Sequence, residues 1–333
     1  MADAASAVLV AAVEGMTLTS EEERFFREES PAGVTLFKRN IPQDDYSRLR
    51  ELTAVLQSTR SSDLPPLVIA IDQEGGRVSR IGPPFPNLGP ALKIMSGGVD
   101  VSSLKVLNDY GHTVGQELAA LGVNVNFAPV LDILTEPKNV AIGDRCFGTE
   151  PEQVWRRAGA FLDGLQSSTV KGCLKHFPGQ GHARVDTHEG TAIVDVSLQT
   201  LLTRELEPFK RLIPRSQMVM ISHSIFPALC DHEASRSHVI INDWLRSRLG
   251  FSGVVVSDDM NMGALPQEVE RWTTALVDVI LAGCDMLLVC RHLDRCKLAL
   301  DTLRRESSRS PAFRIRLEDA AKRVTSFRNG LTL

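Results

Sequence analysis

The segment from residue 175 to residue 188 gathers side chains that can exchange protons. It reads KHFPGQGHARVDTH, an apolar strand end followed by a loop, with two glycines, three histidines and one aspartate. Asp186 and His188 are separated by one residue, so in an extended segment both side chains lie on the same face. The carboxylate can then hold the imidazole in one tautomer. The pair predicts a positioned proton donor for acid-base catalysis.

Further polar residues stand directly after short apolar runs, where charged side chains would be costly as core residues. They are Asp72 after 67–71, Asp132 after 123–130, Lys175 and His176 at the end of 172–176, His223 after 218–222, and Asp258 with Asp259 after 253–257. A shared polar pocket explains these positions better than separate core sites do. We therefore expect the ends of these runs to meet around one site.

Eight short runs rich in apolar and β-branched residues alternate with longer segments of helical spacing. The runs are 7–13, 33–37, 67–71, 123–128, 172–176, 218–222, 253–257 and 285–289. The helical segments are 44–56, 103–121, 151–165, 198–212, 239–249, 269–281, 294–304 and 317–327, after a first helix that Thr19 and Glu22 open as a capping box. This alternation predicts a parallel sheet covered by helices.

Eight such units without a Gly-x-Gly-x-x-Gly motif favour a closed (β/α)8 TIM-type barrel over an open dinucleotide-binding sheet. The length of 333 residues suits one α/β barrel, and 43% hydrophobic residues can fill its core. No linker or low-complexity tract divides the chain, so we expect a single catalytic domain over residues 1–333. In such barrels the functional side chains lie just past the C-terminal ends of the strands.

The charge pattern limits the possible partners. The formal net charge is −4, and the charged residues form no block of one sign. This pattern argues against a nucleic-acid partner and against a polybasic membrane patch. We expect a small neutral or anionic substrate instead.

The cysteines and the N-terminal run indicate the compartment. Cys146, Cys173, Cys230, Cys284, Cys290 and Cys296 include no Cys-x-x-Cys pair and no zinc-type spacing. The apolar run 5–13 has no basic leader and is too short to span a bilayer. We expect a cytoplasmic monomer that uses neither a metal nor another cofactor.

Four motifs occur in an order typical of one enzyme family. They are IDQEGGRV at 71–78, KHFPG at 175–179, DTH at 186–188 and SDDM at 257–260. The longer stretch LGFSGVVVSDDM at 249–260 matches the nucleophile signature of that family nearly position for position. The chain thus resembles glycoside hydrolase family 3, and within it the single-domain bacterial β-N-acetylglucosaminidases of cell-wall recycling. The resemblance runs from about residue 5 to the last predicted helix.

The resemblance implies a retaining double displacement, in which a carboxylate forms a covalent glycosyl-enzyme that water then releases. Carried over by motif, Asp258 is the nucleophile. Asp258 and Asp259 are adjacent, so in a continuous strand they point to opposite sides and only one faces the pocket. The alternation does not say which one, and the choice of Asp258 comes from the resemblance.

The leaving oxygen needs a proton from a second group. Large members of the family take it from a carboxylate on an additional C-terminal domain, which we do not expect here. As in the short members, the resemblance assigns the acid/base role to His188 and makes Asp186 its orienting partner. An imidazole with an ordinary pKa of about 6.5 can donate and accept at neutral pH.

The resemblance also implies which residues bind the hydroxyl groups of the terminal sugar. They are Asp72, Arg145, Lys175 and His176, with Arg77 as a supporting contact and His223 as a pocket-lining residue. Nearby cations such as Lys175 and Arg145 would in addition keep the nucleophile ionised.

Two of these side chains have alternative explanations. Arg77 can instead form an ion pair within the barrel rim, to Glu74 or another acid. His223 can instead be a hydrogen-bonded histidine at a strand end.

The substrate that the resemblance favours is N-acetylglucosamine at the non-reducing end of muropeptide fragments. There it is β-1,4 linked to 1,6-anhydro-N-acetylmuramic acid, with or without peptide. A β-glucosidase or β-xylosidase of the same family is the alternative, because the residues that distinguish an N-acetyl from a hydroxyl group at C2 have no signature in this sequence. Phosphate could also replace water in the second step, since an imidazole repels an anion less than a carboxylate base does.

Two other protein classes fit less well. A non-catalytic sugar-binding barrel is disfavoured, because Asp258 and His188 are both present. A metal-dependent barrel hydrolase would use His176, His182, His223 and Asp258, but no His-x-His ends the first strand.

The histidine loop departs from the family pattern. Members commonly have Pro-Gly-His-Gly-Asp or Pro-Gly-His-Gly-Asn where this chain has Gln180 and His182, and serine where it has Thr187. The spacing of the proton-donating pair is retained. Gly179 and Gly181 can serve as hinges for the loop or can simply form a tight turn.

Overall fold

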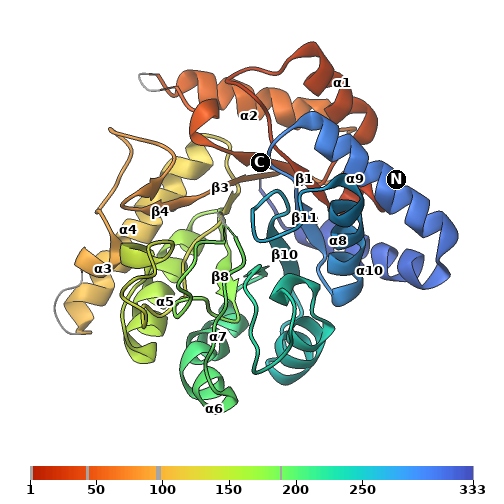
Figure 1. Ribbon diagram of the computed structural model, residues 1–333. Helices are drawn as coiled ribbons and strands as arrows, with labels where there is room; N and C mark the ends of the chain where they lie inside the picture. The colour runs from red at the N-terminus through yellow and green to blue at the C-terminus, as the bar shows by residue number, and fades with distance from the viewer. Residues whose placement is uncertain (1–2, 43–44, 95–98, 188–189, 333) are drawn as a thin grey trace.

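The computed structural model describes residues 3–42, 45–94, 99–187 and 190–332, and Figure 1 shows strands at the centre of the molecule with helices around them. The central strands are β1 (Leu9–Ala11), β2 (Gly33–Leu36), β3 (Val68–Ile71), β6 (Val125–Asn126), β7 (Lys171–Gly172), β8 (Leu174–Phe177), β9 (Met218–Ile221), β10 (Val254–Asp259) and β11 (Met286–Leu288). Their order is β7-β6-β3-β2-β1-β11-β10-β9-β8, and every pairing among them is parallel.

The two ends of this sheet belong to one stretch of chain. Only Cys173 separates β7 from β8, so counting them as one strand leaves eight strands that close into a barrel. The predicted (β/α)8 barrel is therefore confirmed, and each of its eight strands falls within or beside one of the predicted apolar runs.

Residues alternate between two cores along these strands. One core fills the barrel and includes Val68, Cys173, Met220, Val256 and Leu288. The other core lies between barrel and helices and includes the residues of opposite parity, such as Ile69 and Val255. Both layers are mainly apolar, and most of the buried charged side chains of the sheet lie at or near the C-terminal ends of the strands.

The outer layer consists mainly of helices. They are α1 (Ser20–Glu29), α2 (Ser47–Thr59), α3 (Ala91–Ile94), α4 (Val101–Ala120), α5 (Pro151–Ser167), α6 (Leu198–Thr200), α7 (Glu207–Leu212), α8 (Val269–Ala282), α9 (Leu293–Arg309) and α10 (Pro311–Asn329). Short 3-10 turns are η1 (Ser6–Val8), η2 (Lys38–Asn40), η3 (Gly143–Arg145), η5 (Ile213–Arg215) and η6 (Ala234–Arg236), and two π-helical pieces are η4 (Leu201–Glu205) and η7 (Val239–Arg248).

The helix predictions were right in place and partly wrong in type. The capping box of α1 is present, with Glu22 N–H donating to Thr19 Oγ1 and Thr19 N–H donating to Glu22 Oε2. The segments 198–212 and 239–249 contain π-helical turns rather than plain α-helix. In the first of them Pro208 lacks an N–H group and stands at the start of α7, which breaks the hydrogen-bond ladder there.

The predicted first strand is also present, because the run 5–13 forms η1 and β1 and is buried. Within the described ranges, no helix combines the length and the apolar character needed to cross a bilayer. A small antiparallel hairpin, β4 (Gln73–Gly75) with β5 (Val78–Ser79), follows β3 and brings Glu74 over the end of the barrel.

Candidate active site

Five charged side chains, from the end of β3, the β4–β5 hairpin, β8 and η3, form one chain of ion pairs. Lys175 Nζ lies 2.7 Å from Asp72 Oδ1 and 2.6 Å from Glu74 Oε1. Arg145 binds Glu74 through both Nε and Nη2, each at 2.8 Å. Arg80 Nη2 completes the chain 3.1 Å from Asp72 Oδ2. The structure thus brings together three predicted sugar-binding residues and adds Glu74 and Arg80, which sequence analysis had not assigned to the site.

The cations keep the carboxylates in this chain of ion pairs ionised. Burial by itself would raise the pKa of Glu74, but Arg145 and Lys175 outweigh burial and lower that pKa to about 2. The same competition between burial and the charges of Lys175 and Arg80 lowers the pKa of Asp72. Burial opposes the charge of Lys175, yet Asp72 and Glu74 raise the pKa of its ammonium group. Three cations and two carboxylates therefore remain ionised at neutral pH, which leaves one net positive charge.

A second cluster fixes His176 and the start of the histidine loop. Asp132 Oδ2 lies 2.7 Å from His176 Nδ1, and Asp132 Oδ1 accepts the Gln180 N–H at 2.7 Å. Because a carboxylate can only accept, Nδ1 carries the proton and Nε2 is the ring atom left to face other groups. The buried Asp132 was predicted for the pocket, and it acts here by orienting a predicted sugar-binding histidine.

Gln180 has a structural use that explains its departure from the family pattern. Its Oε1 accepts hydrogen bonds from Ser222 Oγ at 2.7 Å and Ser224 Oγ at 3.1 Å. An amide oxygen can accept hydrogen bonds from both hydroxyl groups, and these bonds connect the loop to the segment that follows β9.

The glycines of the loop form a tight turn. Gly179 has a φ of +118° and donates its N–H to the His176 carbonyl at 2.8 Å. A Cβ atom on Gly181 would lie 1.8 Å from the Ile133 carbonyl oxygen, so only glycine fits there. Of the two alternatives for these residues, the structure has the tight turn.

Two adjacent carboxylates end β10, and they have different hydrogen bonds. Asp259 Oδ1 accepts from Asn261 N–H at 3.1 Å, from Asn261 Nδ2 at 2.9 Å and from the Cys290 N–H at 3.1 Å. Asp258 Oδ1 accepts the Asp259 N–H at 2.8 Å. Asp259 thus joins the end of β10 to the end of β11.

The predicted alternation of Asp258 and Asp259 to opposite sides of the sheet is interrupted. The pairing of β10 with β11 shifts register between Val256 and Asp259, so a strict alternation of sides does not hold across Asp258. The hydrogen bonds from Asn261 and Cys290 fix the carboxylate of Asp259 at this strand end.

Electrostatic interactions of the Cys173 thiol indicate that Asp258 lies near this chain of ion pairs. Burial raises the pKa of the Cys173 thiol inside the barrel, Lys175 opposes the rise, and the charges of Asp72 and Asp258 add to it. Interactions of this kind weaken with distance, so all three charged groups lie near the same thiol. The two halves of the site, from β3 with β8 and from β10, therefore converge.

His223 is wholly buried beside this carboxylate. Its Nδ1 lies 2.7 Å from Ser235 Oγ. Burial lowers the pKa of the imidazole, and the negative charges of Asp258 and Asp259 only partly compensate. His223 therefore lies buried next to Asp258, with a hydrogen-bond partner at Nδ1.

Arg77 supports a loop. Its Nη2 donates to the carbonyl oxygens of Val140, Ala141 and Ile142 at 2.6, 2.7 and 3.2 Å, and its Nε lies 3.4 Å from Asp144 Oδ1. The rim ion pair is thus present, with Asp144 and not Glu74 as its acid. By bracing residues 140–144, Arg77 positions the neighbouring Arg145.

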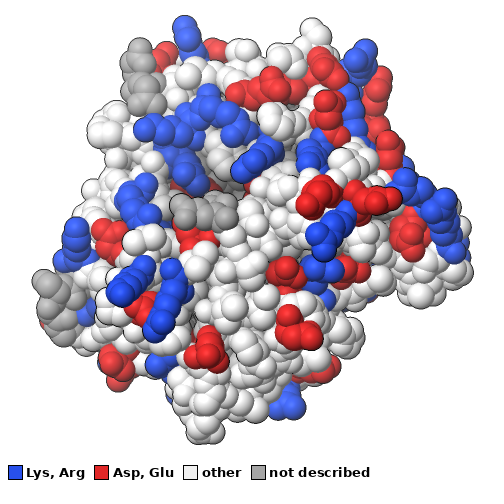
Figure 2. All heavy atoms as spheres, viewed as in Figure 1, with Lys and Arg blue, Asp and Glu red and all other residues white. Residues whose placement is uncertain are grey.

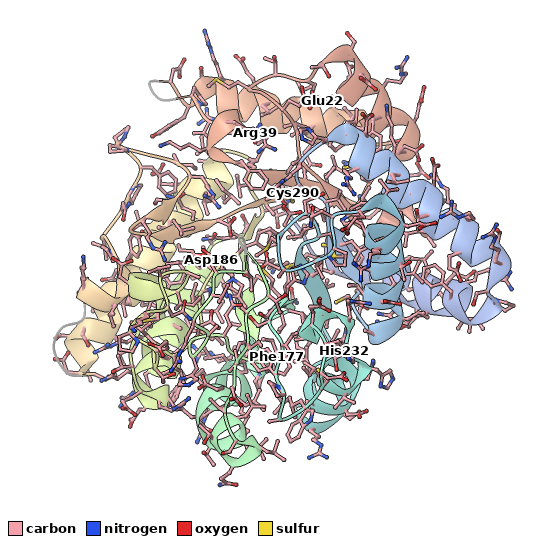
Figure 3. The ribbon with its side chains drawn as sticks, in the orientation of Figure 1. Glu22, Arg39, Phe177, Asp186, His232 and Cys290 are labelled. Carbon is pink, nitrogen blue, oxygen red and sulfur yellow. The ribbon has the colours of Figure 1, made fainter. Side chains whose placement is uncertain are left out.

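The loop with the predicted proton donor is anchored at several points. His188 lies outside the described residues. The preceding Thr187 is buried, and its carbonyl accepts the Ala264 N–H at 3.0 Å. His182 Nδ1 lies 3.0 Å from Thr135 Oγ1, so this unusual histidine is part of the loop's attachment. In Figure 3 the labelled Asp186, from the loop, and Cys290, just after β11, lie near the middle of the view, whereas Phe177 of β8 lies towards α7, where its ring packs on Phe209.

Cations gather on the face drawn in Figure 2, in an arc between α2 and β4 of Figure 1. Arg39, labelled in Figure 3, donates to the carbonyl oxygens of Val13 and Cys290 at 3.0 and 3.1 Å. Arg39 and Arg80 both stack on Phe37, with 4.6 and 5.8 Å to the ring centroid. Among the described residues, no group of three His, Cys, Asp or Glu side chains is arranged to hold a metal ion.

Comparisons with known proteins agree on one family. A model described as the glycosyl hydrolase family 3 N terminal domain matches residues 8–327. A beta-hexosaminidase of Actinobacillus succinogenes is 37% identical over 311 residues, 91% of this chain and 86% of that protein.

Two solved structures share the fold. One is a glycoside hydrolase family 3 beta-N-acetylglucosaminidase from Paenibacillus, with a TM-score of 0.89 and 31% identity over 100% of this chain, which spans 64% of that protein. The other is NagZ from Neisseria gonorrhoeae in complex with N-trifluoroacetyl-D-glucosamine, with a TM-score of 0.79 and 27% identity, covering 95% of this chain and 97% of that one. A match along nearly the whole length, on a barrel whose strand ends carry the family's motifs, shows that this chain belongs to glycoside hydrolase family 3.

Proposed function

We propose that this chain is a retaining exo-β-N-acetylglucosaminidase with Asp258 as its nucleophile. The observation that carries the proposal is that Asp258, at the end of β10, lies at the same end of the parallel barrel as Asp72 and Lys175, which pair at 2.7 Å. A sugar bound by the ion chain would present its anomeric carbon to a carboxylate from β10. The nearby cations favour the ionised carboxylate that nucleophilic attack requires.

The reaction would proceed in two displacements. In the first, an Asp258 oxygen bonds to the anomeric carbon while the glycosidic bond breaks and the leaving oxygen takes a proton from His188. In the second, His188 removes a proton from water, the water oxygen bonds to the anomeric carbon and Asp258 is released. Asp186 would hold the imidazole in the required tautomer.

One hydrogen bond supports the pairing of these distant segments. Ala264 follows the end of β10 by a few residues, and its N–H is bound by Thr187, the residue between the two members of the proposed donor pair. The loop is thereby attached to the chain segment that leaves the proposed nucleophile.

The sugar hydroxyl groups would be bound by Asp72, Lys175, Arg145 and His176. A polar site of this kind excludes analogues that lack the matching hydroxyl groups, because its buried charges would be left unpaired. Arg77 and Asp132 would act one step away, by positioning Arg145 and His176.

For the substrate we propose muropeptide fragments, with N-acetylglucosamine β-1,4 linked to 1,6-anhydro-N-acetylmuramic acid. The names of the relatives support the glycone, and the arc of cations supports a leaving sugar that carries a carboxylate. The six free cysteines agree with a reducing cytoplasm, where we propose that the enzyme acts as a monomer.

A substrate panel tests the reaction. We expect release of nitrophenol from the aryl β-N-acetylglucosaminide, with kcat/KM at least about tenfold above that for the β-glucoside and β-xyloside. Equal or reversed preference would favour the glucosidase or xylosidase alternative, and no turnover of any of them would favour a sugar-binding barrel. Added phosphate that yields sugar 1-phosphate would reveal phosphorolysis.

The donor pair has its own test. His188→Ala should reduce kcat/KM by about 10²- to 10⁴-fold on substrates with poor leaving groups, and much less on activated aryl glycosides, because only the former need a proton. Equal losses on both substrate types would remove His188 from this role. Asp186→Asn should give a smaller loss with the same dependence on the leaving group.

A further inference from the structure

A cavity of about 310 Å³ lies between the two limbs of the histidine loop. Its lining comes from the limb before Asp186 and from the limb that leads towards α6: His182, Arg184, Val185, Thr191, Ile193 and Asp195. None of these residues belongs to the ion chain or to the proposed nucleophile and donor. The sugar-binding scheme therefore leaves this cavity without a role.

Both limbs are held from behind. On the first limb Ala183 is buried, and Arg184 Nε lies 2.9 Å from Glu136 Oε2. On the second limb Ala192 and Val194 are buried. The Ala192 carbonyl accepts the Ile225 N–H at 2.8 Å, and the Val194 N–H donates to the Ile225 carbonyl at 2.9 Å. The buried residues thus fix the backbone of both limbs, and the residues between them line the cavity. The cavity wall is therefore preorganised for a ligand.

The lining combines apolar surface with both signs of charge. Val185 and Ile193 are 46% and 50% exposed, although β-branched apolar side chains are normally covered. The Arg184 side chain is 77% exposed, and its guanidinium has five N–H donors, of which Glu136 engages one. Asp195 supplies the opposite charge and Thr191 a hydroxyl group.

A ligand that matches this lining carries a carboxylate, an amide or ammonium group and a small aliphatic side chain. That combination is the chemistry of a short peptide. A bare sugar would satisfy the hydroxyl and the charges, but it would leave Val185 and Ile193 against polar groups.

We propose that this cavity is a peptide subsite of the enzyme, which binds a short peptide next to the proton-donating segment. This inference rests on the proposed function, and it names a part of the substrate that the sugar-binding residues do not read. The first limb ends at Asp186, so a peptide held there lies beside the bond that is cleaved. An attached peptide would reach the cavity from the leaving sugar, and a free peptide would bind it as a separate ligand.

The test compares the disaccharide N-acetylglucosaminyl-β-1,4-1,6-anhydro-N-acetylmuramic acid with and without its peptide. The measured quantity is the ratio of kcat/KM for the peptide-bearing substrate to kcat/KM for the peptide-free substrate. We expect a ratio of about ten in the wild type, and a ratio near one in the double variant Arg184→Gln with Ile193→Ser.

Two controls isolate the cavity. Glu136→Gln breaks the same ion pair as Arg184→Gln but lies outside the lining, and Ile315→Ser removes an isoleucine of α10 that is 65% exposed, somewhat more than Ile193. Both controls should keep the wild-type ratio. A wild-type ratio near one, or a double variant that keeps the high ratio, would overturn the proposal.

The outcomes also separate this inference from the proposed function. No release of N-acetylglucosamine from either substrate contradicts the proposed function itself. Cleavage of the peptide-free substrate with a wild-type ratio near one contradicts the peptide subsite alone. With a high ratio, inhibition by free alanylalanine that is lost in the double variant shows that the cavity accepts a free peptide as well, and no inhibition assigns it to the attached peptide.

Discussion

The ends of β3 and β10 each carry a pair of carboxylates, and their surroundings differ. Asp72 and Glu74 are bound directly by Lys175, Arg80 and Arg145. Asp259 accepts from the neutral groups of Asn261 and Cys290, and Asp258 accepts from a backbone N–H. The carboxylates at the end of β3 are therefore paired with charges, whereas Asp259 at the end of β10 is held by neutral hydrogen-bond donors.

The difference also appears in the pKa values. At the end of β3 the cations overcome burial and lower the pKa of Glu74 to about 2. At the end of β10 burial raises the pKa of Asp259, because hydrogen bonds from Asn261 and Cys290 only partly compensate. Carboxylates locked into ion pairs hold the cations that bind a sugar. A carboxylate that attacks carbon needs cations close enough to stay ionised but not bound so tightly that its oxygens are unavailable.

The largest effect is expected at Asp258. We expect Asp258→Asn to lower kcat by at least about 10⁴-fold on an aryl β-N-acetylglucosaminide, because the first displacement loses its nucleophile. The melting temperature should stay close to that of the wild type. Trapping with a 2-fluoro glycosyl inhibitor and peptide mapping by mass spectrometry should place the label on Asp258. A label on Asp259, or near-normal kcat in the variant, would refute the assignment.

At the end of β3 the expected effect is on stability. Glu74→Gln leaves Lys175 and Arg145 buried with one carboxylate fewer, which should cost about 3–5 kcal/mol in the free energy of unfolding. Urea denaturation measures it. The exposed pair of Arg27 with Glu23 provides a control, because Glu23→Gln should change stability by no more than about 1 kcal/mol. Equal losses in the two variants would show that burial of these ion pairs does not increase their contribution to the free energy of unfolding.

Glu205 carries a third buried carboxyl group, and it is paired with a single cation. Glu205 in η4 is bound by Arg204 through Nε and Nη2 at 2.8 and 2.6 Å, yet burial outweighs this pair and raises its pKa from an ordinary 4.5 to about 7. The folded state therefore keeps a proton that the unfolded chain releases between pH 4.5 and 7. The stability contributed by this group should fall as pH rises through that window, by up to roughly 3 kcal/mol.

The measurement is the free energy of unfolding of the wild type and of Glu205→Gln at several pH values. The difference between the two proteins should change across pH 4.5 to 7, since glutamine does not titrate. Glu74 contributes with the opposite sign, because its lowered pKa means that stability is lost as pH falls from 4.5 towards 2. A difference that is flat across the upper window would contradict the raised pKa of Glu205.

The smallest effect is expected at Asp259. Asp259→Asn keeps an oxygen that can accept from Asn261 and Cys290, so we expect a loss of about 1 kcal/mol in stability and less than a tenfold change in kcat/KM. The measurement is kcat/KM of Asp259→Asn, compared with that of Asp258→Asn on the same substrate. Similar kinetic losses in the two variants would mean that the two carboxylates of β10 do not have the separate roles described above.

Much of the barrel could be predicted because its signals are local. The eight runs were visible as apolar stretches between helical segments, and the capping box at Thr19 and Glu22 was visible from its spacing. The π-helical turns in η4 and η7 were not, because the same apolar spacing suits an α-helix and a π-helical turn. The register shift in β10 was equally hidden, since it depends on the pairing with β11.

Residue types and short spacings were enough to predict the strand and helix order, the polar residues at the strand ends and the family motifs. The folded structure was needed to see that Glu74 joins Lys175 and Arg145, that Arg77 supports a loop, and that Gln180 accepts hydrogen bonds from two serine hydroxyls. Such partners lie far apart in the chain, 71 residues for Arg145 with Glu74 and 103 for Lys175 with Asp72. Their contacts follow from how the strands are ordered and closed around the barrel, which no local pattern of residues encodes.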